Sequence, residues 1–189
     1  AVAVAAALIP LGRPREGLAA LEAAAAKLPD DVDAWRETLD TLLQSGKAER
    51  SLKLVAKLPT SVAEHPEILR LRAVATEATG NPAGAEELVR RSLSKAPKSW
   101  LALRLHAALL ERMGRKEEIA AAKAAFAEVD EARRLQGENF AKAANVADVE
   151  VCRNLAATYR VFGETRLAER WERESTMAPP SLAISISGR

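Results

Sequence analysis

Four arginines occupy matching places along the chain and could bind anionic groups. Arg36, Arg70 and Arg104 are 34 residues apart, and Arg153 takes the same place in a later segment. A planar guanidinium can donate two parallel hydrogen bonds to a carboxylate, so such a ladder would suit an acidic peptide or a chain terminus. The alternative is an ordinary surface ion pair with an acid three residues earlier, worth about 0.2–0.5 kcal/mol. Three of the four arginines have such an acid: Asp33, Glu67 and Glu150.

Few residues could act as a nucleophile, a base or a soft metal ligand at neutral pH. They are His65, His106 and Cys152, and they share no spacing. The sequence contains no His-Glu-x-x-His, Cys-x-x-Cys, Gly-x-Ser-x-Gly or glycine-rich phosphate-binding motif. We therefore expect no enzymatic activity, no cofactor and no metal site. Because Cys152 is the single cysteine, an intrachain disulfide is excluded.

The element that must position these arginines is a repeat. Gly12, Gly46, Gly80 and Gly114 are 34 residues apart, and each lies between an apolar segment and a charged, alanine-rich segment. A unit of this length is enough for two antiparallel helices and a turn, but it is too short to bury a core of its own. The units must therefore stack on one another.

Composition favours the same architecture and narrows the range of partners. Only 4% of the residues are aromatic, and alanine, leucine, glutamate, arginine and lysine dominate. The predicted fold class is all-α, an α-solenoid of stacked antiparallel helix pairs. A net charge of +2, from 28 basic and 26 acidic residues, does not indicate nucleic-acid binding.

The glycines also divide the chain into units. Gly163 marks the turn of a fifth unit, but it lies 49 residues after Gly114, so an insertion must separate the last two units. Within the insertion, Gly137 and Asn139 are poor interior helix residues and predict a break. The units are 1–31, 32–65, 66–99, 100–133 and 149–180, with an insertion at 134–148 and an extended tail at 181–189. We expect helices near 14–27, 32–45, 47–57, 66–79, 82–95, 99–113, 115–133, 147–162 and 164–177.

When the units are aligned on their glycines, apolar residues fall on one helical face. Trp35, Leu69 and Leu103, for example, share the fourth position of their units. This pattern resembles the tetratricopeptide repeat family over nearly the whole chain. The resemblance rests on Trp35, Gly46, Ala73, Gly80, Ala85, Pro97, Ala107, Gly114, Phe126, Ala156, Tyr159, Gly163, Ala168 and Pro179. It implies a right-handed superhelix of helix pairs.

The resemblance also implies where a partner would bind. In the family, the second, fifth, ninth and twelfth positions of the first helix line a concave groove. The groove residues of this chain are then Arg36, Arg70, Arg104, Arg153, Asp40, Glu77 and Glu111. Such a surface is mixed in charge rather than uniformly positive.

Some positions depart from the pattern of the family. The seventh position, usually apolar, holds Thr38, Arg72 and His106, and Pro59 shortens the second helix of its unit. The family's clamp for the carboxyl terminus of chaperones is not matched either. That clamp needs asparagines and basic residues at places where this chain has Asp40, Leu71, Leu101 and Leu105. The resemblance therefore gives no support to a co-chaperone role.

Three functional hypotheses follow. The leading one is a non-catalytic protein–protein interaction scaffold that binds a peptide or protein partner in the groove. A second is an accessory repeat domain of a larger membrane-associated or secreted assembly protein. A third is a self-assembling scaffold, because an open stack without a strongly polar cap can add another copy of itself. An acidic peptide and a second copy of the chain are both candidate partners.

The two ends of the chain bear on its location. Residues 1–11 are apolar and uncharged, so they could be a truncated helix of the first repeat or the remnant of a signal peptide or membrane anchor. The first interpretation leaves the compartment open, with the cytoplasm slightly favoured. The second places the repeats in the periplasm or at a membrane, contacted through flanking segments.

In the tail, Leu182, Ile184 and Ile186 alternate with small residues, which is the period of a strand.

Overall fold

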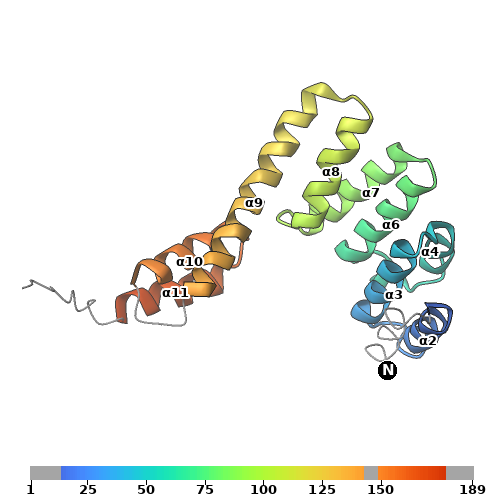
Figure 1. The fold of residues 1–189 in the computed structure, drawn as a ribbon, viewed down its shortest axis with the longest axis horizontal. Coiled ribbons are helices and arrows are strands. Elements are labelled where there is room, and N and C mark those ends of the chain that lie inside the picture. The colour runs from blue at the N-terminus through green and yellow to red at the C-terminus, as the bar shows by residue number, and fades with distance from the viewer. Residues whose placement is uncertain (1–13, 143–148, 178–189) are drawn as a thin grey trace, which may run out of the picture. The chain divides into compact units, whose positions relative to one another are not determined.

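The computed structural model describes residues 14–142 and 149–177, and both stretches consist of helices joined by short turns, without a strand (Figure 1). The helices are α2 (Pro14–Ala26), α3 (Val32–Gln44), α4 (Ala48–Val55), α5 (Thr60–Ala63), α6 (Pro66–Ala78), α7 (Pro82–Lys95), α8 (Trp100–Arg112), α9 (Lys116–Lys142), α10 (Val149–Val161) and α11 (Thr165–Met177). The all-α fold class is confirmed, and each expected helix but one lies within two residues of its predicted bounds. The apolar segment 1–11 and the strand-like tail 181–189 lie outside the described residues.

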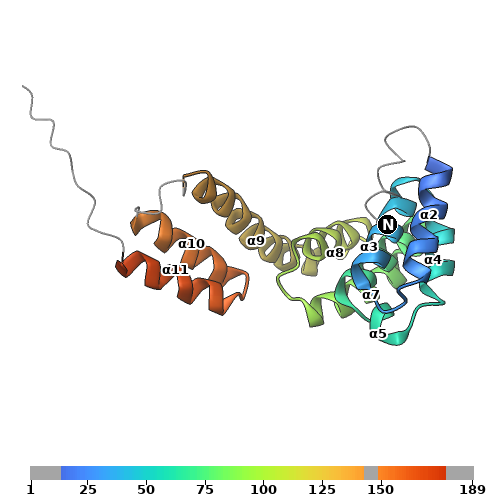
Figure 2. The same cartoon turned by 90° about the horizontal axis from the view of Figure 1, so that it is seen from below.

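Contacts divide the chain into two compact units, residues 1–122 and 123–189. The first contains α2 to α8 and the beginning of α9, and the second contains the rest of α9 with α10 and α11. Within each unit, helices that follow one another in sequence pack side by side, as α6 does on α7 (Figure 1) and α10 does on α11 (Figure 2). The finer division into five repeats with an insertion stays a prediction.

Each of four helix pairs is closed by a glycine in the left-handed conformation. At Gly80, where φ is 87°, the glycine N–H donates to the Glu77 carbonyl at 2.9 Å and the Asn81 N–H donates to the Thr76 carbonyl at 3.1 Å. This Schellman pattern satisfies two carbonyls that the helix end leaves unpaired. The same two bonds recur at the other turn glycines, Gly46, Gly114 and Gly163. The chain therefore reverses in the same way at the end of each first helix.

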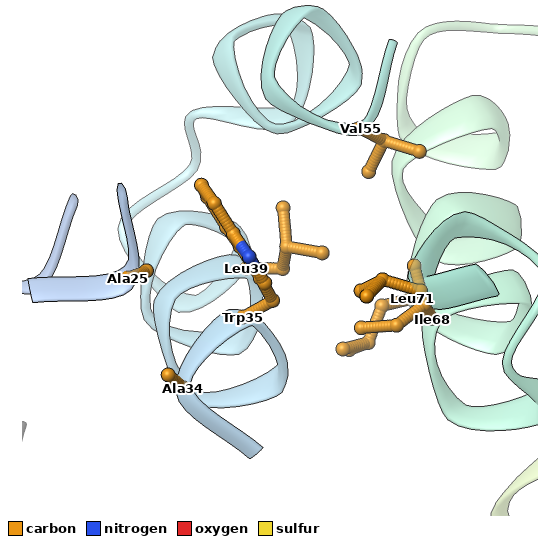
Figure 3. Close-up of a cluster of buried hydrophobic side chains, with 8 residues drawn as sticks. Ala25, Ala34, Trp35, Leu39, Val55, Ile68 and Leu71 are labelled. Carbon is orange, nitrogen blue, oxygen red and sulfur yellow. The ribbon is translucent and has the colours of Figure 1, made fainter. Parts of the chain in front are cut away.

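The first hydrophobic cluster joins α3, α4 and α6 around Trp35. Leu39 of α3, Val55 of α4 and Leu71 of α6 are buried with it (Figure 3). The indole Nε1 of Trp35 donates a hydrogen bond to the Pro29 carbonyl at 3.1 Å, so the one polar atom of the ring is satisfied. Trp35 therefore has a packing role, as its place in the repeat predicts.

The next cluster joins α6, α7 and α8 in a similar way. Leu69 and Ala73 of α6 pack with Ala85 and Val89 of α7, and all four residues are fully buried. The two alanines let the helices of this pair cross closely, since larger side chains would hold them apart. Leu69, which lies on the apolar face that the repeats share, therefore packs against the second helix of its unit.

Pro59 has its predicted effect on α4, and a further helical turn follows it. α4 ends at Val55, and α5 begins directly after Pro59. This single turn was not predicted, because four residues are too few to show a helical period. Val62 of α5 is 1% exposed and belongs to the Trp35 cluster, so the turn supplies core contacts where α4 has ended.

The second unit has a core of its own. Ala132 of α9, Leu155 of α10 and Ala168 of α11 are each at most 4% exposed. Phe140 of α9 meets Trp171 of α11 edge to face, with ring centroids 6.3 Å apart. These contacts hold the later part of α9 against the final helix pair.

The break expected at Gly137 and Asn139 is wrong, because α9 continues through both residues. Asn139 is 5% exposed, and its Nδ2 donates to the Leu135 carbonyl at 2.8 Å, which gives the side-chain amide a hydrogen-bond partner within the helix. Gly137 is exposed, where a single glycine costs a helix only about 1 kcal/mol. The packing of α9 in the second unit outweighs both penalties.

Ion pairs link second helices of neighbouring helix pairs. Arg50 of α4 donates to Glu22 of α2 at 2.8 Å, and Arg90 of α7 donates to Glu118 of α9 at 3.0 Å. Both pairs join residues 28 apart in sequence, so they occupy equivalent places with the charges reversed.

Glu64, in the turn before α6, forms ion pairs with two basic side chains of α7. Arg91 pairs with its carboxylate, and the Lys95 Nζ lies 3.3 Å from it. The hydrogen bond from Arg91 is the main cause that holds the pKa of Glu64 below its ordinary value, and Lys95 adds to the effect. The ionised carboxylate is therefore favoured by folding.

Two glycine-to-alanine changes should alter stability in opposite directions. Gly80→Ala places a side chain at φ +87° and should lower the free energy of unfolding by about 1 kcal/mol. Gly137→Ala, where nothing lies within 4 Å of an added Cβ, should raise it by about 0.5–1 kcal/mol. Urea denaturation of both variants against the wild type measures the two shifts. A less stable Gly137→Ala variant would contradict the continuous helix.

The Glu64 ion pairs should make stability depend on pH. Because the folded state lowers the pKa of Glu64, its contribution is complete above the ordinary value of 4.5 and is lost as the pH falls through the lowered pKa. Glu64→Gln should reduce the Tm at pH 7 by at most about 4 °C, as for an exposed ion pair in a chain of this size. The difference in Tm should vanish at low pH. Glu49→Gln, an exposed acid on α4, is the matched control and should show no such pH-dependent difference.

Candidate partner-binding surface

The first helices of three helix pairs are neighbours in the first compact unit. α3 contacts α6, and α6 contacts α8. Three of the four expected groove arginines, Arg36, Arg70 and Arg104, lie at equivalent places on these helices. The fourth, Arg153, lies on α10 in the second unit and is exposed.

Arg36 and Arg70 pair with the acid three residues earlier. The Arg36 Nε lies 3.4 Å from Asp33 Oδ1, in an exposed pair. Arg70 donates from Nε and Nη2 to one Glu67 oxygen at 3.1 and 3.0 Å, and its side chain is only 11% exposed. Each guanidinium therefore already has a carboxylate, and a ligand at Arg70 would have to displace Glu67.

Arg104 is arranged differently. Leu101 stands three residues before it, so no acid is present at that place. The exposed guanidinium lies over the Trp100 ring, 4.7 Å from the ring centroid. Stacking uses the face of a guanidinium and leaves its N–H edges available for hydrogen bonds.

The acidic groove residues lie among these arginines. Gln44 donates to Asp40 at 2.7 Å, and Glu77 pairs with Arg112 while remaining 16% exposed. Glu111 is exposed on α8. The surface formed by α3, α6 and α8 therefore carries both signs of charge.

The residues singled out for chemistry do not converge. Cys152 is buried within α10, and His65 precedes α6. Among the described residues, no group of three His, Cys, Asp or Glu side chains is placed to hold a metal ion. None of the described helices combines the length and apolar character needed to cross a membrane.

Sequence reasoning missed a buried carboxylate. Glu86 of α7 is 6% exposed and contacts Arg90 at 2.5 Å, His106 at 3.4 Å and Arg115 at 3.6 Å. Glu118 of α9 pairs with both arginines, and these five residues form the Glu86 network. The signal was the polar His106 at a usually apolar position. That Glu86 is the partner of His106 depends on which face of α7 packs against α8, and the sequence of neither helix shows this by itself.

Comparison with known proteins agrees with this architecture. Residues 8–75 match a family model described as tetratricopeptide repeat. A MamA crystal structure is similar at 11% identity and a TM-score of 0.55, covering 88% of this chain and 89% of that chain. A MamA RS-1 ArsTM double mutant is similar at 13% identity and a TM-score of 0.57, and the match covers 92% of this chain and 89% of that chain. TTC0263, a thermophilic TPR protein of Thermus thermophilus, is similar at 15% identity and a TM-score of 0.57, and the match covers 95% of this chain and 90% of that chain.

No curated protein matches the sequence. At such low identities, the likeness to solved structures establishes the shared fold alone. Residues 8–75 thus match the tetratricopeptide repeat model, and the described part of the chain shares an all-α solenoid fold with TTC0263 and has left-handed glycines at the turns of successive helix pairs.

Proposed function

We propose that this protein is a non-catalytic scaffold that binds an acidic peptide segment of a partner on the surface formed by α3, α6 and α8. The tetratricopeptide fold suggests a protein-interaction scaffold in general terms. The observation that carries the finer proposal is Arg104, whose guanidinium is exposed and stacked on Trp100. Stacking orients the guanidinium, so less rotational freedom is lost when it binds a carboxylate.

Arg36 and Arg70 have a secondary role in this proposal. Their own acids, Asp33 and Glu67, compete with a ligand for the same guanidinium groups. The exposed Arg36 pair exchanges partners at little cost, because such pairs are weak in water. Arg70 is less exposed and serves mainly to fix Glu67. Arg104 therefore makes the main contact with the partner.

A fluorescein-labelled peptide of alternating glutamate and alanine tests the proposal by fluorescence anisotropy. Binding to the wild type should weaken as salt is added, because exposed charges are screened. Arg104→Ala should raise the Kd by roughly tenfold or more, the equivalent of one lost charge-assisted hydrogen bond of about 1.5 kcal/mol. Arg70→Ala should have a smaller effect.

The matched control is Lys53→Ala, which removes one exposed positive charge from α4. It should leave the Kd nearly unchanged if binding depends on position rather than on net charge. A glutamine–alanine peptide of equal length should not bind. The proposal fails if the folded Arg104→Ala variant binds the acidic peptide as tightly as the wild type does.

A further inference from the structure

The Glu86 network has a counterpart one repeat earlier from which the carboxylate is missing. Moving back 34 residues from Glu86, Arg90, His106, Arg115 and Glu118 leads to Leu52, Ala56, Arg72, Asn81 and Gly84. All five of these earlier residues line a single cavity of about 480 Å³. The cavity therefore takes the place that the Glu86 network fills in the next repeat.

Small residues account for the open space between α4 and α7. We call the interface between the second helices of neighbouring pairs a seam. Within the first unit, the seam before this one is bridged by the Glu22–Arg50 ion pair, and the seam after it by the Arg90–Glu118 ion pair. At the equivalent places here stand Ala56 and Gly84, which have no charge to pair. Gly84 cannot easily be enlarged, since an added Cβ would lie 2.6 Å from the Asn81 side chain that caps α7.

Arg72 is the charged residue of this cavity that has no acidic partner among the described residues. It stands at the place of His106, but the place of Glu86 is taken by Leu52. Within the described residues Arg72 forms no ion pair, although it is half-buried and lines the cavity. A partly buried guanidinium gains more from a carboxylate than an exposed one does, because solvent screens the pair less.

We infer that this cavity binds a carboxylate on a short apolar stem, supplied by an acidic side chain of a partner protein or by a small dicarboxylic acid. The carboxylate takes the place that Glu86 has in the next repeat and pairs with Arg72. Leu52 and Leu88, which also line the cavity, contact the stem. None of the lining residues is a groove position, so the inference stands apart from the proposed function.

Two further charged residues line the cavity. Arg91 is already held by Glu64, so its guanidinium is engaged before any ligand arrives. Glu87 is exposed and repels an incoming carboxylate. Arg72 therefore provides the charge recognition, and Glu87 limits the affinity.

Nuclear magnetic resonance of the ¹⁵N-labelled protein tests the site with glutarate as the probe. Titration should shift the Arg72 Nε–H signal and the Gly84 amide signal. Leu52→Glu installs an internal carboxylate and should abolish these shifts, whereas Leu52→Gln, of matched size, should retain them. Arg72→Met should weaken binding by about tenfold or more. Glu87→Gln should strengthen it.

Two controls make the outcomes distinct. Arg104→Ala should leave glutarate binding unchanged, which separates this site from the surface of α3, α6 and α8. The capped tripeptide acetyl-Ala-Glu-Ala-amide identifies the source: comparable binding points to a partner protein, and binding of glutarate alone points to a small dicarboxylic acid. The inference is overturned if neither probe shifts the Arg72 signal, or if folded Leu52→Glu and Arg72→Met variants respond to glutarate as the wild type does.

Discussion

Stacking of one helix pair on the next within the first unit is the constraint on which the rest of that unit depends. A pair such as α3 and α4 can bury only part of its apolar surface between its own helices, and α6 of the following pair covers more of it through Ile68 and Leu71. This works along the chain because left-handed glycines reverse it at equivalent places. Residues 34 apart therefore tend to meet similar surroundings.

The same geometry decides which charges meet. A residue on a second helix faces fixed places on the following pair, so a charge there either finds a partner across the seam or is left without one. Glu86 is buried among Arg90, His106 and Arg115, whose contacts offset part of the cost of removing its carboxylate from water. Equivalent places at different seams can therefore be compared. His106 and Arg72 hold the same place in successive repeats, but His106 contacts the carboxylate of Glu86, whereas Leu52 stands where Arg72 would need a carboxylate.

Local features were predictable from the sequence, and features that depend on packing were not. The turn glycines follow from their 34-residue interval, and the Asp33–Arg36 and Glu67–Arg70 pairs follow from three-residue spacings along one helix. The continuation of α9 does not, because Gly137 and Asn139 are poor helix residues whose penalty is offset by contacts in the second unit. The candidate binding surface divides in the same way. The stacking of Arg104 on Trp100 was not predicted, since it depends on how two side chains one helical turn apart are oriented. The Glu86 network was missed because its members come from α7, α8, α9 and the turn before α9, and its geometry appears only when these elements are packed.

The reversed ion pairs at two seams have a consequence for the order of the units. If the pair containing α9 followed α2 directly, Glu118 would face Glu22, and if α4 followed α7, Arg50 would face Arg90. Both wrong orders bring like charges together across a seam, whereas the natural order brings opposite charges together. The helix pairs share one fold but are not all interchangeable, because exchanging the partners of these two ion pairs would set like charges against each other.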